Sequence, residues 1–244
     1  PLHLSRDKEN LIMSTVPFAE LDQDGALAEA IDRVEGDTRA DFLRKAAVTG
    51  GGLVGGGAAF AALAAPAGAQ SASDVNILNF ALTLEFLEAE FYTRAERGGA
   101  LNGRRRLARF ATVVGEHERA HVAALQKTLG RKAVRKPKFD FKGTTDDPAL
   151  FGTTAATLEA TGVAAYGGAA PMVQSNAVLE AAVAIHSVEA RHTAWINHII
   201  GQPPAPVAFY EPKSVSEVLA AVTATGFIAG PIMTRQGGAP GFLG

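Results

Sequence analysis

The sequence contains no cysteine, and this absence excludes several kinds of chemistry. A chain without thiols forms no disulfide, binds no iron–sulfur cluster, and has neither a thiolate zinc site nor a cysteine nucleophile. Any metal that the chain binds must therefore be held by histidine, aspartate or glutamate. Ligands of this kind suit iron, manganese or zinc, and the geometry of the site selects among them.

A strong excess of charge is also absent. The 244 residues carry a formal net charge of −2. The chain therefore lacks the overall basic footprint of a nucleic-acid-binding protein, and we expect no nucleic-acid partner. The alternating apolar and polar pattern of a β-strand is missing as well, and no part of the sequence predicts a strand.

The longest run without charge extends from residue 46 to residue 73 and directly follows Arg44 and Lys45. A basic segment, an uncharged core and the small residues "AGA" near its end are the pattern of an export signal, with cleavage expected after Ala69. The preceding "TRADFLRKA" resembles a twin-arginine signal, with Ala40 in place of the second arginine. We therefore expect export to the periplasm or cell envelope, with transient contact with export machinery.

This uncharged run also permits a second interpretation, in which it anchors the chain in a membrane. Its 28 residues are long enough to cross a bilayer, but six glycines in two triplets are poor helix formers. We divide the chain accordingly into a leader without fixed structure (1–45), an export signal core or anchor (46–69), a helical domain (70–200) and a proline-rich tail with a short helix (201–244).

From Ser73 onward, the apolar residues follow a helical period. The expected helices run from a cap at Ser73 or Asp74 to Gly98, from 104 to 129, from Pro148 after the cap Asp147 to about 167–171, from about 176 to 200, and after Ser214, which forms a capping box with Glu217. Between the second and third helices lies a long connection, with Phe139 and Phe141 as anchors onto the domain. Two antiparallel pairs and one long crossover predict an all-α four-helix bundle with a short C-terminal helix.

The stretch "GEHERAHVAAL", residues 115–125, contains two metal-binding patterns that overlap. His117, Glu118 and His121 spell H-E-x-x-H, in which a zinc protease uses two histidine ligands and a glutamate base. The shorter E-x-x-H, without His117, is what one helix of a four-helix bundle contributes to a two-metal carboxylate site. The two patterns assign different roles to His117.

An internal repeat separates these two patterns. The first helix carries "TLEFLEAEFY" and the third carries "TLEATGVAAY". The second carries "EHERAHVAAL" and the fourth "IHSVEARHTAWI". The repeat keeps E-x-x-H in both halves but replaces His117 by Val188. The metal ligands that this pattern predicts are Glu85, Glu118, His121, Glu159, Glu189 and His192.

The surroundings of these residues favour a metal. Steps of four and three along the second and fourth helices place both E-x-x-H pairs on apolar faces. A carboxylate on such a face costs several kcal/mol unless a partner neutralises it, and a metal ion is the natural partner.

Several polar neighbours have less defined roles. Tyr92 and Tyr166 each follow a predicted glutamate ligand by seven residues, so they are candidate catalytic residues that donate hydrogen bonds to the site, or else ordinary core tyrosines. Glu88 has Gly162 as its counterpart, so we expect it at the surface or behind the ligands. His186 is a candidate for orienting a ligand. We expect structural or solvent-facing roles for His117 and His198, and a packing role for Trp195.

Residues 74–200 resemble the ferritin-like superfamily, and "ILNFALTLEFLEAEFY" is similar to its desiccation-related, ferritin-like-domain branch. The resemblance implies a ferritin-like four-helix bundle in which Glu118 and Glu189 bridge two metal ions. Glu85 with His121, and Glu159 with His192, would complete the two sides. The resemblance favours iron, with manganese as the alternative.

The activity that the resemblance implies is that of an oxidoreductase acting on dioxygen or peroxide, either as a ferroxidase or peroxidase or as a manganese-catalase-like enzyme. The export-like leader and the proline-rich tail differ from a cytosolic storage cage, although a homo-oligomer stays open. Two alternatives also remain at this point. The chain is either a stress- or desiccation-protective structural bundle without turnover, or a zinc protease that uses His117 and His121.

Overall fold

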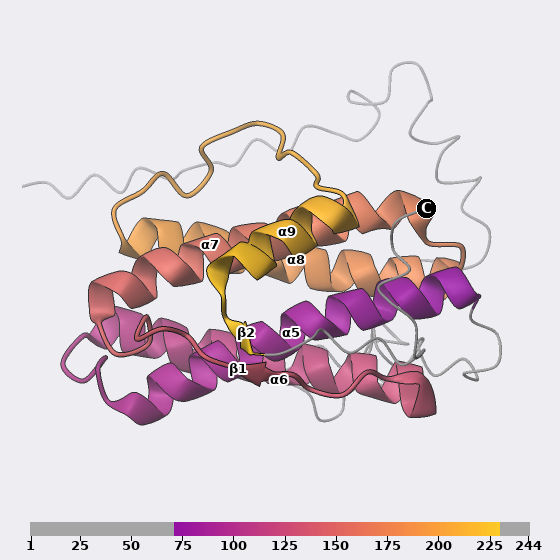
Figure 1. Ribbon diagram of the computed structural model, residues 1–244. Helices are drawn as coiled ribbons and strands as arrows, with labels where there is room; N and C mark the ends of the chain where they lie inside the picture. The colour runs from indigo at the N-terminus through magenta and orange to yellow at the C-terminus, as the bar shows by residue number, and fades with distance from the viewer. Residues whose placement is uncertain (1–70, 230–244) are drawn as a thin grey trace, which may run out of the picture. The chain divides into compact units, whose positions relative to one another are not determined.

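The computed structural model describes residues 71–229. Four long helices and one short one make up most of this region: α5 (Ala72–Gly98), α6 (Arg105–Leu129), α7 (Pro148–Ala169), α8 (Asn176–Ile199) and α9 (Val215–Thr225). Helix α5 packs along α6, and α7 packs along α8 (Figure 1). The predicted all-α four-helix bundle with a short C-terminal helix is confirmed.

The predicted leader and export core lie outside the described residues, as does the end of the tail from residue 230. Within residues 71–229, no helix combines the length and the apolar character that a membrane span requires.

The long crossover after α6 is held down by its aromatic residues. It follows the 3₁₀ turn Gly130–Lys132 and includes the short strand β1 (Lys138–Phe139). Phe139 and Phe141 are buried, as expected of anchors. Strand β1 pairs antiparallel with β2 (Ile228–Ala229), with Phe139 opposite Ile228. The expectation that the chain has no strand was therefore wrong, because strands of two residues are too short to show a period in the sequence.

The start of α5 differs from its prediction. The helix begins at Ala72, and the side chain of Ser71, rather than Ser73 or Asp74, accepts the capping hydrogen bond. The carboxylate of Asp74 is instead buried and accepts hydrogen bonds from the backbone N–H groups of Gln174 (2.9 Å) and Ser175 (3.2 Å). Asp74 thus satisfies backbone donors at the start of α8 and ties the two halves of the bundle together.

The other predicted helix starts are confirmed. Asp147 accepts hydrogen bonds from the N–H groups of Ala149 and Leu150 at the start of α7, where Pro148 is the first helical residue. Ser214 and Glu217 form the capping box of α9. Helix α9 packs against α7. The 3₁₀ turn Ala170–Met172 follows α7.

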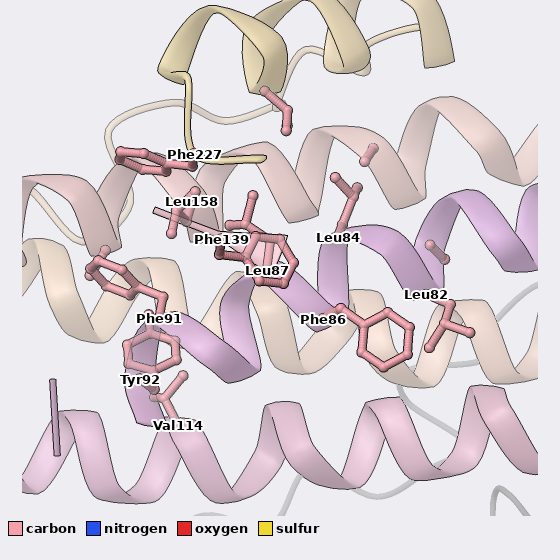
Figure 2. Packing of buried hydrophobic residues seen from close by; sticks show 14 of the residues in the cluster. Leu82, Leu84, Phe86, Leu87, Phe91, Tyr92, Val114, Phe139, Leu158 and Phe227 are labelled. Carbon is pink, nitrogen blue, oxygen red and sulfur yellow. The ribbon is translucent and has the colours of Figure 1, made fainter. Parts of the chain in front are cut away.

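The two ends of the bundle are filled by different side chains. Toward the end of α5, Phe91 stacks on Phe151 with ring centroids 5.3 Å apart and meets Tyr92 and Phe141 edge to face. Figure 2 shows Phe91 and Tyr92 in this cluster beside Val114 of α6. The opposite end, around the start of α5, contains mainly aliphatic side chains. The polar centre of the bundle lies between these two regions.

Candidate metal centre

Four glutamates and two histidines from the four long helices meet in the middle of the bundle. They are Glu85 of α5, Glu118 and His121 of α6, Glu159 of α7, and Glu189 and His192 of α8. All four glutamates are fully buried, and the histidines are 6% and 3% exposed. The structure brings together the six residues that the repeat singles out.

These six residues form two groups, each with ligand atoms that all lie within 4.8 Å of one another. The first group contains Glu85, Glu118, His121 and Glu189, and the second contains Glu118, Glu159, Glu189 and His192. Glu118 and Glu189 belong to both groups. The shared pair is the one to which the resemblance assigns the bridging role.

Each histidine turns its Nδ1 atom toward the carboxylates. Nδ1 of His121 lies 3.2 Å from Glu85 Oε2, 3.1 Å from Glu118 Oε2 and 3.2 Å from Glu189 Oε1. Nδ1 of His192 lies 3.0 Å from Glu118 Oε1 and 3.1 Å from Glu159 Oε2. Each Nδ1 therefore points to the place that an ion would occupy.

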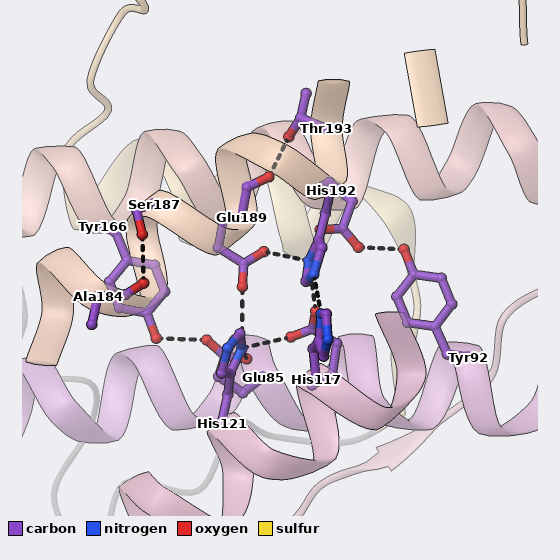
Figure 3. Close-up of polar contacts among 12 residues, drawn as sticks. Glu85, Tyr92, His117, His121, Tyr166, Ala184, Ser187, Glu189, His192 and Thr193 are labelled. Carbon is purple, nitrogen blue, oxygen red and sulfur yellow. Dashed lines mark hydrogen bonds and ion pairs between the residues drawn. The ribbon is translucent and has the colours of Figure 1, made fainter. Parts of the chain in front are cut away.

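The two tyrosines donate hydrogen bonds to glutamates of the opposite half. Tyr92 of α5 donates to Glu159 of α7, while Tyr166 of α7 donates to Glu85 of α5, at 2.5 Å. Figure 3 shows the two phenols on opposite sides of the cluster. Burial and neighbouring carboxylates raise the pKa of both phenols well above its ordinary value, so both stay protonated. Their hydrogen bonds orient two carboxylates, and a catalytic role for either tyrosine stays a prediction.

Glu88 does not lie at the surface. Its side chain is only 3% exposed and lies one turn beyond Glu85 on α5. A methyl group added at Gly162 would lie 3.4 Å from Glu88 Oε1 and 3.4 Å from Glu189 Oε2. The glycine in α7 thus leaves room for two carboxylates, and Glu88 is a fifth buried acid beside the candidate ligands. The part of the prediction that placed Glu88 behind the ligands fits this position.

Three further histidines of the described region belong to neither group of candidate ligands. His186 packs against Tyr210, with ring centroids 5.1 Å apart. Among the described residues, no hydrogen bond or ion pair joins His186 to a candidate ligand, and its buried Nδ1 has no hydrogen-bond partner, so the structure does not support the expectation that it orients one. His198 is exposed, and its Nε2 lies 2.9 Å from Arg106 Nη2. His117 is also exposed, but its Nδ1 lies 2.8 Å from Nε2 of His192.

The position of His117 differs from that of a zinc ligand in the H-E-x-x-H pattern of a zinc protease. His117 belongs to neither group of candidate ligands. Its partner is a histidine of another helix, and Glu118, the residue that would serve as the protease base, lies within both groups.

Burial and mutual contacts redistribute the protons of this cluster. Burial raises the pKa of Glu159 to about 7 and raises that of Glu118 well above its ordinary value. Burial opposes the charged form of His192, but the close carboxylates of Glu118, Glu159 and Glu189 outweigh it and raise the pKa to about 12. The pKa of His121 is likewise raised, against burial, by the charge of Glu85 and by contacts with Glu118 and Glu189. Protons thus neutralise the cluster when no metal is bound.

The cluster also leaves acceptors without donors. Among the described residues, Glu118 Oε1 and both carboxylate oxygens of Glu189 are buried and have no hydrogen-bond partner, although histidine nitrogens lie within ion-pair distance. A buried carboxylate oxygen without a donor costs free energy. A metal ion would remove this cost for the two glutamates that both groups share. The donor set therefore fits metal held by oxygen and nitrogen ligands.

Comparison with known proteins agrees with this architecture. No curated protein matches the chain. Residues 73–202 match the ferritin-like domain, and this segment contains the four long helices except Ala72, together with all six candidate ligands. The chain therefore belongs to the ferritin-like domain family.

Proposed function

We propose that this protein binds two metal ions in the centre of the bundle and acts as an oxidoreductase. The observation that carries the proposal is the buried pair Glu118 and Glu189, which both groups share and which retains carboxylate oxygens without donors. Glu85 and His121 would complete one side, and Glu159 and His192 the other. The oxygen and nitrogen ligands suit iron or manganese, and the resemblance to the ferritin-like superfamily favours iron.

When bound, two reduced metal ions would supply the electrons that dioxygen or peroxide takes up. The residues of the chain orient the ligands and exclude water. Tyr92 and Tyr166 hold Glu159 and Glu85 in place by hydrogen bonds. The full burial of the four glutamates keeps bulk water away from the ligands, so their interactions with an ion are not weakened by solvent.

A cavity at the aliphatic end favours dioxygen as the reactant. It lies beside Tyr166 and has a volume of about 20 Å³. Its wall presents no polar surface, and the lining includes Leu84, Leu125, Ala165, Ala181 and Ile185. Water in such a space finds no hydrogen-bond partner. Dioxygen, which is small and apolar, needs none, whereas hydrogen peroxide would lose its hydrogen bonds on entry.

If dioxygen reaches the site through this cavity, filling the cavity should slow the reaction. Replacing Ala181 by leucine adds apolar volume at the cavity wall and is expected to slow dioxygen consumption by the iron-loaded protein several-fold. The metal content should stay unchanged because Ala181 lies two turns before Glu189 on α8 and is not a candidate ligand. An oxygen electrode measures the rate, and mass spectrometry measures the metal.

Ala190→Leu is the matched control, because Ala190 is exposed on the same helix. Equal rates for the Ala181 variant and the wild type would show that dioxygen does not pass through the cavity. Bound metal without consumption of dioxygen or peroxide would instead favour a structural bundle without turnover, as expected of a protein that protects against desiccation.

We also propose that the protein is exported. The support is the sequence pattern of residues 46–69, which lie outside the described residues. Expression of the full chain with its leader should yield a mature protein in the periplasm or cell envelope that begins at Gln70. N-terminal sequencing of the fractionated protein tests this. An intact leader in the membrane fraction would indicate the anchor, and an intact leader in the cytoplasm would contradict export.

A further inference from the structure

His117 contacts the edge of the His192 ring that points away from the carboxylates. The planes of the two rings are inclined by 17° with centroids 5.1 Å apart, and His117 Nδ1 lies 2.8 Å from His192 Nε2. The other nitrogen of His192, Nδ1, faces Glu118 and Glu159. Figure 3 shows His117 and His192 adjoining each other in the cluster.

This contact selects one tautomer of His192. A histidine that binds a metal through Nδ1 keeps its remaining proton on Nε2. That N–H would donate to Nδ1 of His117, which then carries its own proton on Nε2, on an exposed side chain. A hydrogen bond of this kind fixes both the orientation and the tautomer of a metal-binding imidazole.

The other half of the bundle lacks this contact. Val188 of α8 occupies the position equivalent to His117, and it is half-buried. Within residues 71–229, no hydrogen bond reaches Nε2 of His121, whose hydrogen bonds and ion pairs all involve Nδ1. The two halves match in their glutamates, their E-x-x-H pairs and their tyrosines. They differ in the hydrogen bond to Nε2 of the E-x-x-H histidine, which His192 has and His121 lacks.

We propose that His117 is a positioning residue for His192 and makes the two metal positions unequal. The position built by Glu159 and His192 binds its ion more tightly than the position built by Glu85 and His121. This inference rests on the proposed function, since it requires that both positions bind metal. Loss of a hydrogen-bond partner behind a histidine ligand typically weakens metal binding about 10- to 100-fold.

The experiment titrates the metal-free full chain with Mn²⁺ by calorimetry. The wild type should bind two ions with different affinities. His117→Val, which copies the other half, should weaken one ion about 10- to 100-fold and bring the two affinities together. Val188→His, which copies His117 into the other half, should tighten the weaker ion. A residue that acts only through general stability would not give opposite effects in these two variants.

Two further variants show which position His117 serves. Glu85→Gln disables the side that contains His121, and Glu159→Gln disables the side that contains His192. His117→Val should weaken the ion that remains in the Glu85→Gln chain. It should leave the affinity of the Glu159→Gln chain for its remaining ion unchanged.

The outcomes separate this inference from the proposed function. A wild type that binds no Mn²⁺ and no Fe²⁺ would contradict both. If the wild type binds two ions and His117→Val changes neither affinity, the role of His117 is overturned and the di-metal site stays in place. If His117→Val lowers the metal affinity equally in the Glu85→Gln and Glu159→Gln chains, the role of His117 is also overturned, because an equal loss indicates a general effect on folding.

Discussion

Simultaneous replacement of Glu118 and Glu189 by alanine is expected to remove both metal ions. Each of these residues belongs to both groups of candidate ligands, so the double variant takes two carboxylates from each position. The wild-type chain, produced with iron and manganese available, should contain about two ions, as a site of this type holds. The variant should contain almost none. Mass spectrometry of the purified full chains measures the metal content.

A matched control is available on the same two helices. Glu116 of α6 and Glu180 of α8 are exposed, so Glu116→Ala/Glu180→Ala makes the same change in charge without touching the cluster. This control should keep both ions. Two ions retained by the Glu118/Glu189 variant, or a single zinc ion unaffected by loss of Glu189, would rule out the di-metal centre.

Metal binding is expected to release protons and to strengthen steeply as the pH rises. In the metal-free protein the pKa of His192 is about 12 and that of His121 is also raised, so both rings are protonated at neutral pH. Each must lose the proton on Nδ1 to bind an ion. Protons therefore compete with the metal, and lowering the pH weakens binding. Two displaced protons change the combined affinity about 100-fold per pH unit.

Calorimetric titrations with Mn²⁺ at pH 7, in buffers with different ionisation enthalpies, count the released protons. The count should be two or more, because Glu118, with its raised pKa, and Glu159, with a pKa of about 7, also lose protons as the metal binds. His198→Gln should leave the count unchanged, since His198 is exposed and lies outside the cluster. Metal binding without proton release would contradict the protonation of His121 and His192.

Much of the bundle could be predicted from the sequence because its signals are local or repeated. The apolar period and the turn residues indicate the helices, and the repeat aligns two E-x-x-H pairs in helices far apart in the chain. The start of α5 was predicted less well, because Ser71, Ser73 and Asp74 are all suitable caps within a few residues. Asp74 has its true partners 100 and 101 residues away, and no local pattern reveals such a contact.

The details around the metal centre depend on which helices face each other. The spacing of seven residues places Tyr92 on the same face as Glu85, but the phenol donates to Glu159 on another helix. Comparison of the two halves favours residues that both share, so it assigned His117 no role in the site. The contact with His192 follows from the packing of α6 beside α8. The signal in the sequence was that His117 in one half has Val188 as its counterpart in the other, although the two halves otherwise match.

The reciprocal partners of Tyr92 and Tyr166 have a consequence for how the bundle is built. Each helical hairpin supplies a phenol to a glutamate of the other, and each supplies one shared glutamate to the other's metal group. Reciprocity of this kind defines an isologous interface, the type found between identical subunits of a symmetric dimer. The single chain thus has the geometry of two fused copies of one hairpin. Neither hairpin contains a complete group of candidate ligands, so the candidate metal centre is complete only when the two hairpins are docked.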